Sequence, residues 1–110
     1  MDKKHITFAV AICMSLPLAA HASELLAREK QCFQCHQISG NSIGPSFQNI
    51  ASKWKGRQNA QVLLTNVIRD GSSRSPIGPH WGNARMPNDS ERPLVNDAEA
   101  KELVAWMLAQ

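Results

Sequence analysis

The chain has 110 residues, 43% of them hydrophobic and 19% charged, with a formal net charge of +3 at pH 7. This length suits one small domain with a small hydrophobic core, and the composition excludes a disordered chain, a collagen-like repeat and a polytopic membrane protein. The charge is modest and spread along the chain, so nucleic-acid binding is not indicated, and three cysteines are too few for a disulfide-rich scaffold.

Residues 1–22 are predicted to be a secretory signal peptide. Lys3 and Lys4 give it a positive start, residues 6–16 form its apolar core, and a small-x-small pattern ends at Ala22. The apolar run is shorter than the about 20 residues that a membrane-spanning helix needs. An uncleaved N-terminal anchor is the alternative, but we expect cleavage after Ala22 and export to the periplasm.

Cleavage there leaves residues 23–110 as the mature domain, 88 residues long and with a net charge of +2. It also removes Cys13, so that the odd number of cysteines becomes a pair, Cys32 and Cys35. We expect no stable membrane insertion of this mature domain.

Four segments of the mature chain carry helical signals, and no stretch alternates convincingly as a β-strand. The first covers residues 23–31, with Ser23 able to cap its start. The second follows Gly44-Pro45, with the proline at its first helical position, and ends at Gly56. These signals indicate helices on both sides of the first irregular segment.

The third helical segment begins at Asn59, a capping residue, and ends at Gly71. The fourth begins at Asn96, which forms a capping-box pattern with Glu99. Residues 72–94 lie between them without a helical pattern, and irregular stretches of this length are usually functional. The predicted fold class is therefore all-α.

The sequence Cys32-Phe33-Gln34-Cys35-His36 forms the C-x-x-C-H pattern of covalent haem attachment. Two thiols one helical turn apart can add to the two vinyl groups on one edge of a haem. His36 then presents its imidazole to the iron, and its other ring nitrogen needs an acceptor that fixes the tautomer.

Three other interpretations of this motif are weaker. A thioredoxin-like redox pair belongs beside a βαβ pattern, which the sequence lacks. A structural zinc site needs four ligands; the mature chain offers only Cys32, Cys35, His36 and His80, and the adjacent Cys35 and His36 ligate one ion poorly. A disulfide between the two cysteines would close a very short loop and stabilise little.

With this motif, Gly44-Pro45 and a later Met86-Pro87, the chain resembles the short bacterial class I cytochromes c over nearly all of residues 23–110. The resemblance implies an all-α domain of about four helices wrapped around one covalently attached haem c. It also implies that the Pro45 carbonyl accepts a hydrogen bond from His36, and that the indole N–H of Trp81 points to a haem propionate.

The chain departs from the family pattern at two places. Residues 71–81 form a longer connection than usual, and a single proline follows Met86 where two are frequent. The first departure affects the backbone path beside the propionates, and the second leaves the loop around Met86 less rigid.

The sixth iron ligand separates an electron carrier from a gas-binding or peroxide-activating haem. We expect Met86, because it lies in an irregular, proline-flanked loop, whereas Met107 lies on the apolar stripe of the last helix and is expected in the core. A methionine opposite histidine raises the reduction potential relative to two imidazoles. His80 is the competing ligand and would give a bis-histidine haem of lower potential.

The predicted function is single-electron transfer by an exported monohaem cytochrome c that is not an enzyme, with redox partner proteins as donor and acceptor. A peroxidase-like haem enzyme and an electron-accepting subunit of one dehydrogenase remain alternatives. We expect the haem-free chain to be largely unfolded. Expected pocket walls are Trp54 and Trp106, and the basic residues that could steer an acidic partner are Lys53, Lys55 and Arg57.

Overall fold

The computed structural model of the chain describes residues 16–73, 81 and 84–110. Its elements in chain order are α1 (Leu16–Glu29), the short 3-10 helix η1 (Cys32–Gln34), α2 (Phe47–Trp54), α3 (Ala60–Asp70) and α4 (Asp97–Leu108). The described residues form no β-strand, and only an isolated antiparallel bridge joins Trp81 to Ala84. The predicted all-α fold is confirmed.

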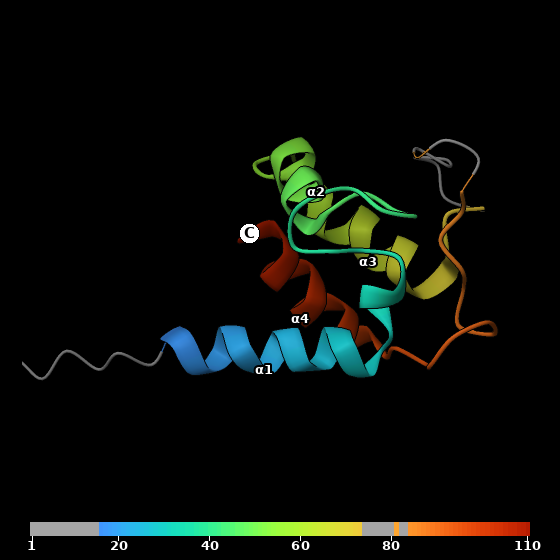
Figure 1. Ribbon diagram of the computed structural model, residues 1–110, viewed down its shortest axis with the longest axis horizontal. Coiled ribbons are helices and arrows are strands. Elements are labelled where there is room, and N and C mark those ends of the chain that lie inside the picture. The colour runs from blue at the N-terminus through green and yellow to red at the C-terminus, as the bar shows by residue number, and fades with distance from the viewer. Residues whose placement is uncertain (1–15, 74–80, 82–83) are drawn as a thin grey trace, which may run out of the picture.

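Helix α4 is the centre of the fold, because it packs against α1, α2 and α3. Figure 1 shows α1 along one side of α4, with α2 and α3 on the other. The Phe47 ring meets the Trp106 ring nearly edge-on, with 5.0 Å between the ring centroids. The largest fully buried side chains are Phe47, Leu103, Val95 and Val104. The core is therefore built mainly where α2 and the segment before α4 meet α4.

Two predicted helix ends are confirmed. The Asn96 side chain accepts a hydrogen bond from the backbone N–H of Glu99, and the Glu99 carboxylate accepts one from the N–H of Asn96, so the capping box is complete. Gly71 follows the last residue of α3 with φ of 76°, a conformation that favours glycine. Both ends depend on residues close together in the sequence.

Two other predicted helix starts are wrong in detail. Pro45 lies outside α2, and Ser46 is the N-cap, with its hydroxyl oxygen accepting from the N–H of Asn49 at 3.0 Å. Asn59 precedes α3 but forms no side-chain cap, because its backbone is left-handed with φ of 70°. Its carbonyl still accepts the first helical hydrogen bond, from the N–H of Leu63 at 2.9 Å.

Helix α1 begins at Leu16, before the predicted start at residue 23. Alanine and leucine dominate this earlier segment and have high helix propensity, so the helix continues through it. Ser23 therefore lies inside α1, where its hydroxyl bonds to the carbonyl of Ala19 and the carboxylate of Glu102, both at 3.1 Å. Among the described helices, none is long and apolar enough to cross a membrane.

Lys30 ties the end of α1 to the start of α4. Its ammonium donates to the carbonyl of Leu94 at 2.8 Å and pairs with the carboxylate of Glu99 at 3.1 Å. The Lys30 side chain is only 13% exposed, so these contacts are partly shielded from water. They fix the direction in which the chain leaves α1, and so the position of η1.

Candidate functional site

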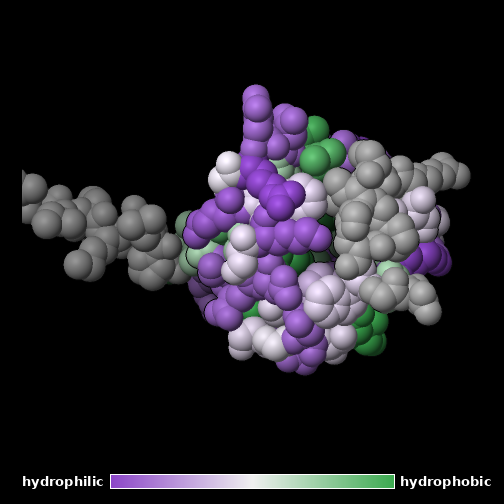
Figure 2. Space-filling model, turned by 90° about the horizontal axis from the view of Figure 1, so that it is seen from above, coloured by the Kyte–Doolittle hydropathy of each residue, from purple (hydrophilic) through white to green (hydrophobic). Residues whose placement is uncertain are grey.

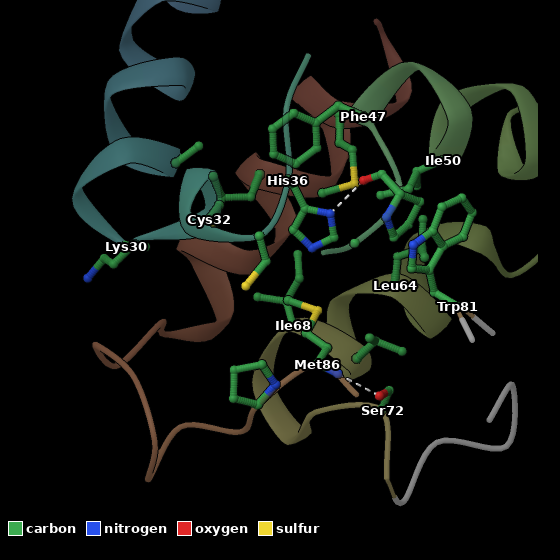
Figure 3. Close-up of a pocket in the computed structure, with 18 of the residues that line it drawn as sticks. Lys30, Cys32, His36, Phe47, Ile50, Leu64, Ile68, Ser72, Trp81 and Met86 are labelled. Atoms are coloured by element: carbon green, nitrogen blue, oxygen red, sulfur yellow. Dashed lines mark hydrogen bonds between the residues drawn. The ribbon is translucent and has the colours of Figure 1, made fainter. Parts of the chain in front are cut away.

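A mostly apolar pocket lies between η1, the loop of residues 37–46, helices α2 and α3, and the loop of residues 84–95. Figure 3 shows its side chains converging from these elements. The pocket brings together the six site residues predicted from the sequence: Cys32, Cys35, His36, Pro45, Trp81 and Met86. Its apolar walls include Phe47, Ile50, Leu64, Ile68, Leu103 and Trp106.

The imidazole of His36 is fixed in one orientation and one tautomer. Its Nδ1 lies 2.7 Å from the carbonyl oxygen of Pro45, and because a carbonyl only accepts, Nδ1 carries the proton. The ring also stacks on Phe47, with 5.4 Å between centroids and 26° between planes. This arrangement leaves the Nε2 lone pair free to bind a metal.

Burial supports the neutral form of this imidazole. Desolvation lowers the pKa of His36 below its ordinary value of 6.5, and the hydrogen bond to the Pro45 carbonyl opposes that shift in part. A neutral imidazole is the form that ligates iron.

Gly44 gives the His36 ring the space that it occupies. A Cβ at Gly44 would lie 2.8 Å from Cε1 of His36 and 3.0 Å from Nδ1. The N–H of Gly44 donates to the carbonyl of Cys35 at 2.7 Å, so the loop lies directly against the motif. The absence of a side chain at Gly44 is therefore part of the cradle that holds the imidazole.

Helix η1 presents the two cysteines of the motif to the pocket as free thiols. The N–H groups of Cys35 and His36 both donate to the carbonyl of Cys32, at 3.3 and 3.0 Å. Burial raises the pKa of the Cys32 thiol, and the positive charge of Arg92 opposes this shift. The Cys32 side chain is thus a neutral thiol in an apolar setting, and no disulfide joins it to Cys35.

Met86 reaches the pocket from the wall opposite His36, and in Figure 3 the two side chains point toward each other. Its backbone is held from both sides by one buried residue, Ser72. The N–H of Met86 donates to the Ser72 hydroxyl at 2.8 Å, and its carbonyl accepts from the Ser72 N–H at 3.1 Å. The end of α3 therefore positions the thioether.

The other predicted residues differ in how directly the structure places them. Trp54, Trp106 and Met107 are buried and line the pocket, as expected for core and pocket walls. Trp81 is half-buried and also lines it. His80 and most of the connection over residues 71–81 lie outside the described residues.

The described residues favour none of the three other interpretations of the motif. They contain no strand to support a thioredoxin-like pair, and Cys32 and Cys35 are unbridged. Within residues 16–73, 81 and 84–110, no three histidine, cysteine or acidic residues lie close enough together to hold a metal ion. His80, which a zinc site would need, is not among them.

The donor set fits a haem c. The pocket offers one free imidazole nitrogen, one thioether on the facing wall and two thiols at one end, all between apolar walls. Histidine and methionine are a ligand pair of cytochromes c, and cysteine thiols form the covalent links. The Gly44 cradle favours the same interpretation, because it leaves space for an imidazole that has no other bonding partner at Nε2 among the described residues.

Three residues of this site carry no functional motif in the sequence: Gly71 and Ser72 hold the Met86 segment in place, and Arg92 lines the pocket. Gly71 was predicted only as a helix stop, yet its missing side chain also lets the Met86 segment approach. Ser72 and Arg92 lie in the irregular stretch and carry no motif. Their roles depend on contacts across the fold, which no local pattern records.

The chain matches the family model described as "Cytochrome c" over residues 20–110. It is 33% identical to "Cytochrome c-552" of Hydrogenobacter thermophilus, over 93% of this chain and 95% of that protein. It is 33% identical to "Cytochrome c-551" of Pseudomonas aeruginosa, over 83% of this chain and 79% of that protein. The crystal structure of wild-type Nitrosomonas europaea cytochrome c552 superposes with a TM-score of 0.66 at 34% identity, covering 78% of this chain and 96% of that one.

Proposed function

This chain belongs to the cytochrome c family, and we propose that His36 and Met86 hold the iron of its haem c from opposite sides. It is a small electron carrier rather than an enzyme, and it carries one covalently attached haem c. The observation that carries the ligand proposal is that His36 and Met86 face each other across one pocket, with the His36 ring held by the Pro45 carbonyl and the Met86 backbone held by Ser72.

When bound, haem c supplies an iron that gains and loses one electron. Cys32 and Cys35 would hold the group through thioethers, and the Pro45 carbonyl fixes the His36 imidazole in the tautomer that leaves Nε2 free. The soft thioether of Met86 favours ferrous iron, which raises the reduction potential. The apolar walls keep water from the centre, so the surroundings reorganise little when the charge changes.

A pair of methionine variants tests this ligand assignment. In the haem-loaded ferric protein, Met86→Ala should abolish the far-red absorption band that arises from sulfur bound to iron. Met107→Leu is the matched control, because Met107 is the buried methionine of α4 and should leave the band in place. A band that persists in Met86→Ala would overturn the proposal.

The burial pattern of α1 supports cleavage after Ala22, which would accompany export to the periplasm. Residues 18–22 are exposed, and Ser23, the first residue after the proposed cleavage site, is the first buried one. Removing residues 1–22 therefore takes no described side chain out of the core. The mass of the protein isolated from the periplasm tests this directly, and a full-length mass there would contradict it.

Cytochromes c act with redox partner proteins, and we place the surface that steers an acidic partner at the end of α2. Lys53, Lys55 and Arg57 are exposed there, and Lys53 also lines the pocket. Figure 2, which looks onto α2, shows hydrophilic side chains over much of this face. The rate of reaction with an acidic partner should fall as salt rises, and a flat response would refute steering.

A further inference from the structure

Arg92 is a cation at the edge of the pocket whose side chain is largely covered. Its side chain is only 10% exposed, although arginine is almost never buried without a partner. It lines the same pocket as His36 and Met86. It lies in the loop that connects Met86 to α4, five residues after Pro87.

The hydrogen bonds of the guanidinium go mainly to uncharged groups. Its Nε donates to the carbonyl of Pro87 at 3.2 Å, and Nη1 donates to the carbonyl of Pro93 at 3.3 Å. Nη2 is buried and has no hydrogen-bond partner among the described residues. Backbone carbonyls fix the guanidinium in place, but they do not cancel its charge.

One carboxylate, that of Asp89, offsets the charge in part. Its Oδ1 lies 3.3 Å from Nη1 of Arg92, but the geometry does not make a hydrogen bond, and this buried oxygen has no other partner in the described chain. The nearby Glu91 carboxylate is engaged by Arg85 and by the N–H of Asn88. Because the Asp89 side chain is 29% exposed and that of Arg92 only 10%, water screens the carboxylate more than the guanidinium.

Arg92 lines the same pocket as both cysteines of the motif that attaches the haem. Inside a protein the effective dielectric constant is far below that of water, so a buried charge acts over a longer range than an exposed one.

We propose that Arg92 raises the reduction potential of the centre by placing a buried positive charge beside it, with Asp89 setting how much of that charge is felt. The inference rests on the proposed function. The ferric centre carries one more positive charge than the ferrous centre, so a neighbouring cation disfavours the ferric form.

Potentiometry on the haem-loaded protein tests this with four variants. Arg92→Gln should lower the equilibrium ratio of ferrous to ferric protein about tenfold, which is a fall in reduction potential of about 59 mV for one electron. Arg92→Lys keeps the charge and should stay close to the parent protein. Asp89→Asn should shift the potential in the opposite direction, upward. Arg28→Gln is the matched control, because Arg28 also pairs with one carboxylate but its side chain is 55% exposed.

The salt dependence gives a second readout. In about 1 M salt, where the Debye length is about 3 Å, the Arg92→Gln shift should persist because the charge is buried. Any small shift in Arg28→Gln should disappear under the same conditions.

Three results would overturn the proposal. Equal reduction potentials in Arg92→Gln and Arg28→Gln would show that the charge of Arg92 does not act on the centre more than an exposed charge does. A reduction potential as low in Arg92→Lys as in Arg92→Gln would assign the effect to the lost hydrogen bonds with the carbonyls of Pro87 and Pro93. The far-red band could vanish in Arg92→Gln, which would make Arg92 a clamp of the ligand loop. Absence of that band in the parent protein would instead refute the ligand assignment itself.

Discussion

Replacing Gly71 by alanine tests how the fold holds Met86. Gly71 has φ of 76°, and an added Cβ would lie 2.7 Å from the carbonyl oxygen of Met86 and 3.1 Å from the amide nitrogen of Asn88. These are backbone atoms, so no side-chain rotation relieves the overlap. The substitution therefore strains the backbone of residue 71 and also pushes the Met86 segment away from Ser72.

The two effects have separate magnitudes. A residue other than glycine at φ of 76° and ψ of 176° costs roughly 1–3 kcal/mol of backbone strain. Overlap with the Met86 segment adds about 1–3 kcal/mol, the range typical of overpacked sites. If the segment relieves this overlap by moving, Met86 binds more weakly, and an added imidazole should compete for the ferric iron about 5- to 150-fold better.

Gly56→Ala is the matched control. Gly56 has φ of 78°, but an added Cβ there would meet nothing within 4 Å, so this variant pays only the backbone cost. Both variants should lose stability in guanidinium unfolding of the haem-loaded protein. Only Gly71→Ala should bind imidazole more tightly, measured by loss of the far-red band during titration. Equal imidazole affinity in the two variants would refute the reasoning.

Three more predictions concern the two ligand loops. Ser72→Ala leaves the Met86 N–H without its acceptor, which costs about 1–3 kcal/mol of stability. The variant should bind added imidazole severalfold more tightly, and an unchanged imidazole affinity would contradict the role of Ser72 in holding Met86. Gly44→Ala places a Cβ 2.8 Å from Cε1 of His36 and should reduce the haem-to-protein ratio after maturation. A ratio equal to that of the parent protein would show that the imidazole does not need the space at Gly44. Glu91→Gln should destabilise the protein at pH 6 but hardly at pH 2, as followed by guanidinium unfolding.

The pH dependence of the Glu91 prediction follows from its hydrogen bonds. The bond from Arg85, with that from the N–H of Asn88, lowers the pKa of Glu91 from 4.5 to about 2. Because the folded state lowers this pKa, the stabilisation is fully present above pH 4.5 and is lost as the pH falls toward 2. A stability difference between parent and Glu91→Gln that does not change over this range would refute the role of the carboxylate.

The parts of the fold that the sequence predicted well are those set by neighbouring residues. The capping box of Asn96 and Glu99 is local, and so is the glycine that ends α3. The C-x-x-C-H motif is local as well, because its spacing alone places two thiols and one imidazole together at η1 and the two residues that follow it. Met86 was expected as the ligand opposite His36 both from its proline-flanked loop and from the family resemblance.

The parts that could not be predicted depend on contacts across the fold. Pro45 was expected as the first residue of a helix, but α2 starts after Ser46, whose hydroxyl caps it. The burial of Arg92 follows from how its loop closes over the pocket, which the sequence of an irregular stretch does not reveal. Ser72 holds Met86 only because the end of α3 lies beside that loop.

The central claim is that this chain is a one-electron carrier whose haem c is bound covalently and ligated by His36 and Met86. An absorption-monitored redox titration of the haem-loaded protein tests it most directly. We predict a single one-electron transition, a ferric far-red band that disappears on reduction, and haem that stays with the protein after acidic solvent extraction. Haem released by the solvent, or a ferric spectrum without the far-red band, would contradict the account.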